Sequence, residues 1–256
     1  MKNSIGVAST AGIEYILDHL PYSEFNSILD IGCGDCFATY KFKENGKKVT
    51  ALGLNIEEYG VKKNELREKN IEVIEDNFFT FDFQNKKYDA VWAAHILEHT
   101  TNPGLFLDRI KSLLNPDGYA IIVVPPYKSK LVGGHMCTGW TLGQLTYFLL
   151  TNGFDVKNGQ FVKNGYNLVA IVRIADYELP KINHDKGDLE ILADYFPSEM
   201  NIKQGSEGDI YSINWPYQIT KEERNYRWMT FKSEILSFLE RSKYSIKNIC
   251  SDYKKN

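Results

Sequence analysis

The stretch Asp30-Ile31-Gly32-Cys33-Gly34 decides the fold of this 256-residue chain. The apolar run 28–31 predicts a short strand, and residues 37–45 predict a helix after the stretch. Gly32 and Gly34 allow a sharp turn and let backbone N–H groups approach a ligand closely. In an open α/β sheet, the first strand-to-helix turn lies where ligands bind. The stretch therefore predicts such a sheet, with a ligand site at this turn.

The alternation of strands and helices continues towards the C-terminus. Further strands are predicted at 49–54, 71–74, 88–94, 119–124, 154–162 and 166–174, and further helices at 57–69, from Pro103 onward and at 141–151. Asn115-Pro116-Asp117-Gly118 predicts a turn. The last two strands follow each other closely enough to pair antiparallel. The pattern predicts an α/β fold, a Rossmann-like doubly wound sheet of seven strands with an antiparallel last strand.

The chain divides into two parts by composition. We expect residues 1–174 to form one domain, in which residues 1–27 are an N-terminal helical cap. Residues 175–256 are a C-terminal extension with dispersed aromatics and prolines, including a helix from Lys221 to about Lys243. The extension has enough apolar residues to pack, and its role as a lid, a buttress or a dimer contact stays open.

Composition and charge narrow the class of protein. Thirty basic and 33 acidic residues give a net charge of −3 without a basic block, so a nucleic-acid partner is not expected. The longest apolar run, 120–126, is too short for a membrane span, and residues 1–11 lack the apolar stretch of an export signal. Four scattered cysteines indicate a reducing compartment, and we expect a cytoplasmic protein. Cys33 and Cys36 form a C-x-x-C pair, which the glycine turn explains better than redox or zinc chemistry.

The glycine turn is compatible with more than one nucleotide cofactor. A dinucleotide site needs a third glycine where Phe37 stands, which argues against NAD. The stretch from Tyr88 to His99 resembles the fourth-strand signature of the class I SAM-dependent methyltransferases of the small-molecule type, and Leu113 to Gly118 resembles the segment before their fifth strand. The resemblance covers roughly residues 25–174 and rests on the stretches 28–34, 49–55, 73–78, 88–99 and 102–125.

This resemblance implies S-adenosylmethionine (SAM) as the cofactor and a set of binding residues. The glycine turn would line the methionine part, Asp76 and Asn77 would bind the adenine, and Ala94 would lie near the sulfonium. The family usually has an acid at the end of its second strand, where this chain has Gly53, and Asn55 or Glu57 would substitute for it. The predicted cofactor residues are Asp30, Gly32, Cys33, Gly34, Asn55, Asp76, Asn77 and Ala94.

The candidate catalytic residues are histidines. His135 lies on a glycine-bearing loop after the fifth strand, at the edge of the sheet where functional residues gather. It is the predicted general base and acceptor-binding residue, with His95 as the second candidate base. Tyr127 is a candidate acceptor contact, whereas His99 is expected to make a structural polar contact. No Asp/Glu/His trio is expected to lie together, which argues against a metal-dependent enzyme.

These features predict a methyltransferase that moves the SAM methyl group to a small polar acceptor. The Asn/Asp-Pro-Pro-aromatic motif of amino-group methyltransferases is absent, because Val124 precedes Pro125-Pro126-Tyr127 and the run follows strand five. Oxygen is therefore the favoured acceptor atom, in a sugar, a phospho-metabolite or a surface-glycan building block of polysaccharide biosynthesis. The alternatives are an N- or C-methyltransferase of a small metabolite and a non-catalytic SAM-binding regulatory protein. A homodimer is left open.

Overall fold

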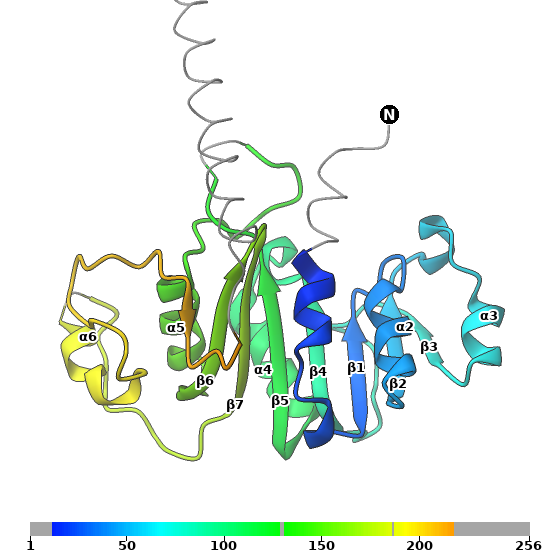
Figure 1. Cartoon of the computed structure of the whole chain (residues 1–256), viewed down its shortest axis with the longest axis horizontal. Helices are drawn as coiled ribbons and strands as arrows, with labels where there is room; N and C mark the ends of the chain where they lie inside the picture. Colours follow the sequence, from blue (N-terminus) through cyan, green and yellow to red (C-terminus); the bar gives the residue numbers. More distant parts are fainter. Residues whose placement is uncertain (1–11, 129–130, 186, 218–256) are drawn as a thin grey trace, which may run out of the picture. The chain divides into compact units, whose positions relative to one another are not determined.

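The computed structural model describes residues 12–128, 131–185 and 187–217 (Figure 1). Contacts between Cα atoms divide the chain into two compact units, residues 1–217 and residues 218–256, and the described residues all lie in the first. The helix predicted at 221–243 lies outside the described residues. Residues 1–11, the first part of the predicted N-terminal cap, also lie outside them.

One sheet organises the described part of the chain, in the order β3-β2-β1-β4-β5-β7-β6-β8. Its strands are β1 (Ser27–Ile31), β2 (Lys48–Gly53), β3 (Glu72–Glu75), β4 (Tyr88–Ala94), β5 (Leu114–Val124), β6 (Phe154–Asn164), β7 (Asn167–Ile174) and β8 (Ser212–Ile213). Strands β1 to β5 pair parallel, and β7 pairs antiparallel with both β5 and β6. The predicted fold class and the antiparallel seventh strand are confirmed.

The predicted number of strands is too low by one. Strand β8 comes from the C-terminal extension and pairs antiparallel with β6, through Phe161 opposite Ile213 and Val162 opposite Ser212. Two residues are too few to show the alternation of apolar and polar side chains by which a strand is recognised. The extension thus adds to the edge of the sheet, and the main chain of residues 175–217 remains in the same compact unit.

The helices agree with the predicted ones except after β2 and in the extension, where α6 was not predicted. Residues 12–18 are helical, followed by α2 (Phe37–Glu44), α3 (Lys63–Glu68), α4 (Pro103–Leu113), α5 (Leu142–Thr151) and α6 (Asp188–Ile191), and 3₁₀ turns occupy η1 (Tyr22–Glu24), η2 (Ile56–Tyr59), η3 (Leu97–His99) and η4 (Ala193–Tyr195). The single helix predicted at 57–69 is wrong, because Gly60 takes a φ of +83° and separates η2 from α3. That left-handed conformation interrupts a helix.

The turn predicted at 115–118 is also different in the structure. These residues lie inside β5 as a bulge, since Tyr88 pairs with Leu114 whereas Ala90 pairs with Tyr119. A Cβ at Gly118 would lie 3.0 Å from the Asn115 carbonyl oxygen and 3.1 Å from that of Asp89, so the tight bulge requires glycine. The chain leaves α4 and enters β5 through this bulge without a separate turn.

Apolar side chains cover both faces of the sheet, as expected for a doubly wound fold. On one face, Trp92 of β4 packs edge-on against Phe42 of α2, with ring centroids 5.6 Å apart. On the other, Val91 belongs to a buried cluster that includes Phe106 of α4 and Leu145 of α5. Neighbouring residues of a strand point to opposite faces, and both faces of the sheet are buried. Its functional groups must therefore gather at the carboxyl ends of the strands.

Candidate functional site

A cavity of about 380 Å³ lies at the carboxyl ends of β1 to β4. Its wall includes the glycine turn after β1 (Gly32 and Gly34), Gly53 at the end of β2, and Asp76 and Asn77 after β3. The residues that follow β4 complete it, among them Ile96, His99, Thr100 and Thr101. The cavity therefore stands at the edge of the sheet where the sequence places the ligand site.

The conformation of the glycine turn explains its composition. The N–H groups of Gly32 and Cys33 both donate to the Leu52 carbonyl, at 2.8 and 3.0 Å, and so fix the turn against β2. Gly32 has a φ of +71°, and a Cβ there would lie 2.1 Å from Cδ1 of Ile96. Gly34 has a φ of +51°, but a Cβ there would meet only the Gly32 carbonyl oxygen, at 3.9 Å. A side chain at position 32 would clash with Ile96, whereas a side chain at position 34 would enter unoccupied space.

Exposed apolar side chains surround part of the cavity. Leu54, Tyr59 and Phe79 line it, yet they are 59%, 61% and 41% exposed. Large apolar groups gain free energy when a ligand removes them from water. Asp76 lies among them as an exposed carboxylate whose Oδ1 accepts from the Asn77 N–H at 2.6 Å. A group of apolar side chains with one carboxylate at its border suits a flat heterocycle that carries an amino group.

Asp30 does not contribute to the cavity wall. Its carboxylate is 2% exposed, and its Oδ2 accepts a hydrogen bond of 2.5 Å from the Thr39 hydroxyl. Burial raises the pKa of Asp30 to about 7, although the bond from Thr39 acts in the opposite direction. The sequence could not show this, because a residue at the end of a strand can point either toward the ligand or toward α2.

The raised pKa of Asp30 has a consequence for stability. The carboxyl is protonated below about pH 3.8 in both the folded and the unfolded chain, and between that pH and about 7 only the folded chain retains the proton. The free energy of unfolding should therefore fall through this window and stay at its lower level above it. We expect Asp30→Asn to abolish this decline and to raise the stability at pH 8 by an amount on the order of a few kcal/mol.

Urea unfolding of both proteins between pH 4 and 8 measures the effect. Thr39→Val serves as a control, since it removes the hydroxyl that favours the carboxylate and should extend the decline to higher pH. Equal pH profiles for wild type and Asp30→Asn would show that Asp30 is solvated.

Three other predicted cofactor residues also lie outside the cavity wall. Cys33 is buried, Ala94 is half-buried, and Asn55 is exposed with a φ of +51°. Gly53 lines the cavity in place of the family's usual acid, and a Cβ there would lie 3.1 Å from Sγ of Cys33. A side chain at position 53 would therefore require the Cys33 side chain to shift. The cofactor roles of these residues stay predictions.

His95 uses both ring nitrogens within the protein. Nε2 lies 2.8 Å from Oδ1 of Asn167, and Nδ1 lies 3.2 Å from Oε1 of Glu98. Both partners offer acceptor oxygens, and this arrangement favours the imidazolium form, in which both ring nitrogens donate. Burial lowers the pKa of His95, but the hydrogen bond to Glu98 and the charge of that carboxylate outweigh it and raise the pKa above its ordinary value. An imidazolium held in this way does not accept a further proton.

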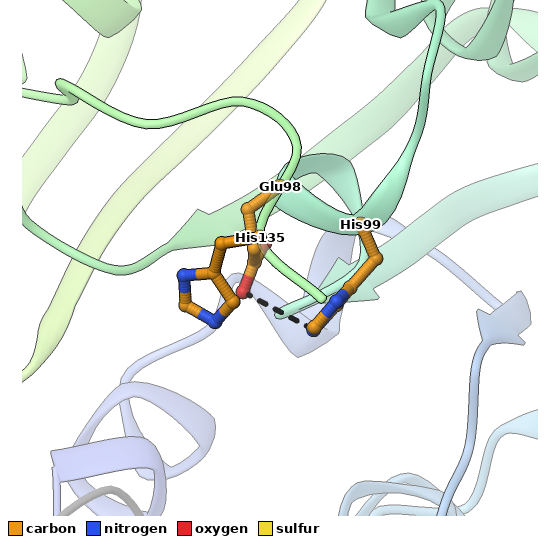
Figure 2. A group of neighbouring side chains, drawn as sticks. All are labelled: Glu98, His99 and His135. Atoms are coloured by element: carbon orange, nitrogen blue, oxygen red, sulfur yellow. Dashed lines mark ion pairs between the residues drawn. The ribbon is translucent and has the colours of Figure 1, made fainter. Parts of the chain in front are cut away.

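His135 lies beside Glu98 and His99 (Figure 2). The loop that carries it is fixed to η3, because the N–H groups of Met136 and Cys137 donate to the Glu98 carbonyl at 2.7 and 3.1 Å. The rings of His99 and His135 meet edge-on with centroids 5.0 Å apart. Partial burial keeps the pKa of His135 below its ordinary value, although the charge of Glu98 acts in the opposite direction.

The expectation that no Asp/Glu/His trio lies together is therefore wrong. One potential ligand atom each from Glu98, His99 and His135 lies within 4.8 Å of the other two. Sequence reasoning assigned His99 a structural role only, yet His99 also lines the cavity at the glycine turn. The spacing H-x-x-E-H at the end of β4 was the available signal, but the partner loop is distant in sequence.

The residues predicted to contact the acceptor lie outside the wall of the cavity at the glycine turn. Tyr127, a predicted acceptor contact, is 62% exposed, and its N–H donates to the Trp140 carbonyl at 2.8 Å. A small pocket of about 20 Å³ beside His135 is lined by Pro126, Trp140 and Tyr166. A separate cavity of about 630 Å³ lies between α5 and residues 184–208, away from every predicted site residue. Its position argues against a role in binding at the glycine turn.

Comparison with known proteins agrees with this geometry. Residues 29–122 match a family model described as a methyltransferase domain. This matched segment therefore resembles a methyltransferase domain. This domain is similar to the mitochondrial ubiquinone biosynthesis O-methyltransferase of Dictyostelium discoideum, at 27% identity over 41% of this chain and 36% of the relative. It is also similar to (S)-coclaurine N-methyltransferase of Papaver somniferum, at 25% identity over 47% of this chain and 36% of the relative.

The fold is shared with solved methyltransferases. A SAM-dependent methyltransferase from Aquifex aeolicus superposes with a TM-score of 0.52 and 21% identity, over 63% of this chain and 89% of that one. The chain spans only about two fifths of the curated relatives it matches, so their substrates do not transfer to it directly. Among the described helices of the methyltransferase domain and its extension, none has the length and apolar character to cross a membrane.

Proposed function

We propose that this chain binds SAM at the glycine turn and transfers its methyl group to the oxygen of a small polar acceptor. The observation that carries the proposal is the cavity of about 380 Å³ that joins Gly34, Asp76 and the exposed ring of Tyr59. The methionine part would lie along the glycine turn, and the adenine would lie among the apolar side chains with its amino group toward Asp76. The family of the domain supports this choice of cofactor.

Methyl transfer from SAM requires the protein mainly to align the reacting groups. The sulfonium is already an activated methyl donor, so binding must place the acceptor atom, the methyl carbon and the sulfur in line. A hydroxyl acceptor must also lose its proton, whereas a carboxylate or phosphate oxygen needs no base. Both ring nitrogens of His95 are occupied, so the predicted role of base passes to His135, which lies beside His99 and Glu98.

Oxygen is favoured over nitrogen by the missing amino-methylation motif, and the relatives include both O- and N-methyltransferases. Nitrogen or carbon methylation of a small metabolite is the second candidate, and a SAM-binding regulatory protein is the third. Incubating the full chain with labelled SAM and a panel of sugar nucleotides, phospho-metabolites and amines tests all three. Formation of S-adenosylhomocysteine with a hydroxylated acceptor alone supports the proposal, transfer to amines supports the second candidate, and SAM binding without any turnover supports the third.

The wider assignments are parts of the same proposal. We place the protein in the cytoplasm, with a small-molecule acceptor and without a nucleic-acid partner. Residues 1–174 would form the catalytic domain. The pairing of β8 with β6 supports a buttressing role for the described part of the extension, rather than a lid.

Asp76 gives a direct test of the adenine position. Replacing Asp76 with alanine removes the acceptor for the adenine amino group, which should cost about 1–3 kcal/mol, or a rise in the Kd for SAM of roughly 5- to 150-fold. Titration calorimetry measures the change. Asp82→Ala is the matched control, because Asp82 also accepts from a nearby N–H, that of Gln84 at 2.8 Å, but lies outside the cavity wall. Equal affinities for Asp76→Ala and wild type would show that the adenine lies elsewhere.

A further inference from the structure

We propose that Glu98, His99 and His135 bind a divalent first-row metal ion of the zinc type beside the cofactor cavity. The three side chains come from two segments, η3 and the loop between β5 and α5, and they converge without help from a ligand (Figure 2). Their donor atoms lie within 4.8 Å of one another. A tetrahedral zinc centre with bonds of about 2.1 Å separates its ligand atoms by roughly 3.4 Å, so a small inward movement completes the site.

The ring of His99 is oriented as a metal ligand requires. Its Nδ1 lies 2.9 Å from the Gly134 carbonyl oxygen, and a carbonyl can only accept, so Nδ1 carries the proton. In the neutral ring, the lone pair is then on Nε2, which lies 4.0 Å from Oε1 of Glu98. Metal-binding histidines usually donate their other nitrogen to a carbonyl or carboxylate in this way, because the bond fixes both the tautomer and the ring plane.

Glu98 supplies an independent indication. Its side chain is fully buried, and Oε2 has no hydrogen-bond partner among the described residues. His95 bonds only to Oε1, at 3.2 Å. A buried carboxylate oxygen without a partner is costly, and such atoms call for a bound ion or another missing partner. A cation that binds the carboxylate through both oxygens would satisfy Oε2 as well as the Oε1 atom that faces His99.

The donor set selects the kind of ion. Two imidazoles and one carboxylate suit zinc and the neighbouring transition metals, whereas magnesium and calcium prefer oxygen ligands. Three protein ligands leave at least one coordination position for water or substrate. His99 also lines the cavity at the glycine turn, so the ion would stand at its border. A role of the open position in holding the acceptor rests on the proposed function, but the binding of the ion does not.

Metal binding can be measured without any assay of methyl transfer. Full-length protein without an affinity tag is stripped with a chelator, and then titrated with Zn²⁺ by calorimetry and with Co²⁺ by visible absorption. We expect one ion per chain, with His99→Gln and His135→Gln each weakening binding by roughly 100-fold or more, since even indirect partners of a site contribute 10- to 100-fold. His184→Gln is the matched control, because His184 is exposed and lines a different cavity from His99.

The outcomes separate the metal site from the proposed function. Absence of binding in the stripped wild type would overturn the metal site, and so would unchanged affinity in His135→Gln. Since Glu98 is buried, Glu98→Gln is used only if its circular dichroism matches the wild type, and it should then abolish the Co²⁺ spectrum. A SAM titration of the same stripped protein tests the cofactor site on its own, so either site can fail while the other stands.

Discussion

Replacing Gly34 with valine should abolish SAM binding while the chain stays folded. A Cβ at position 34 would meet no protein atom closer than the Gly32 carbonyl oxygen, at 3.9 Å, so the valine methyl groups would enter the cavity instead. The cofactor must approach the backbone of this turn closely, and the side chain would occupy that space. We expect the Kd for SAM to exceed the range of calorimetry.

The backbone strain of this substitution must be separated from its effect on the cavity. Gly34 has a φ of +51°, where a β-branched residue costs roughly 1–3 kcal/mol. Gly46→Val is the matched control, because Gly46 has a φ of +75°, lies between α2 and β2, and has open space where its Cβ would be. Both variants should lose similar stability in urea unfolding, and only Gly34→Val should lose SAM. Unchanged SAM affinity in folded Gly34→Val would refute the cofactor site.

Sequence predicts best those parts of the fold that depend on the local pattern of apolar and polar residues. The predicted limits of β4, at Tyr88 and Ala94, are confirmed, because six of these seven residues are aromatic or apolar and polar residues flank the run on both sides. Helix α4 begins at Pro103, with Asn102 accepting from the Leu105 N–H at 3.1 Å, as helix-start chemistry predicts. These features need no knowledge of distant residues.

The features that sequence did not predict depend on contacts between distant segments. Whether Asp30 faces the cavity or Thr39 depends on how α2 packs on the sheet, and the sequence pattern is the same in both cases. The convergence of Glu98 and His135 depends on the two hydrogen bonds that hold the β5–α5 loop to the Glu98 carbonyl. The sequence shows that a histidine lies on a glycine-bearing loop. It does not show which part of the fold this loop contacts.

Replacing His135 with glutamine should lower kcat strongly while the affinity for SAM stays near the wild-type value. His135 is absent from the wall of the cofactor cavity, so its loss leaves the SAM contacts in place. Assisted removal of a hydroxyl proton is worth roughly 10²–10⁴-fold in rate, and that is the expected range of the loss if His135 is the general base. A rise in KM alone would make His135 an acceptor-binding residue, and unchanged kinetics would indicate an acceptor that ionises without a base.

A fall in kcat for His135→Gln has two explanations, and the metal site decides between them. If His135 acts as a base, wild-type protein stripped by a chelator keeps its activity, and added Zn²⁺ changes nothing. If His135 acts as a metal ligand, the stripped wild type falls to the level of the variant, and Zn²⁺ restores the wild type alone. His99→Gln sharpens the comparison, because Nδ1 of His99 already donates to the Gly134 carbonyl and Nε2 faces Glu98. A base mechanism makes His99 largely dispensable for kcat, whereas a metal mechanism requires His99 and His135 equally, since each would supply one of two imidazoles to the same ion.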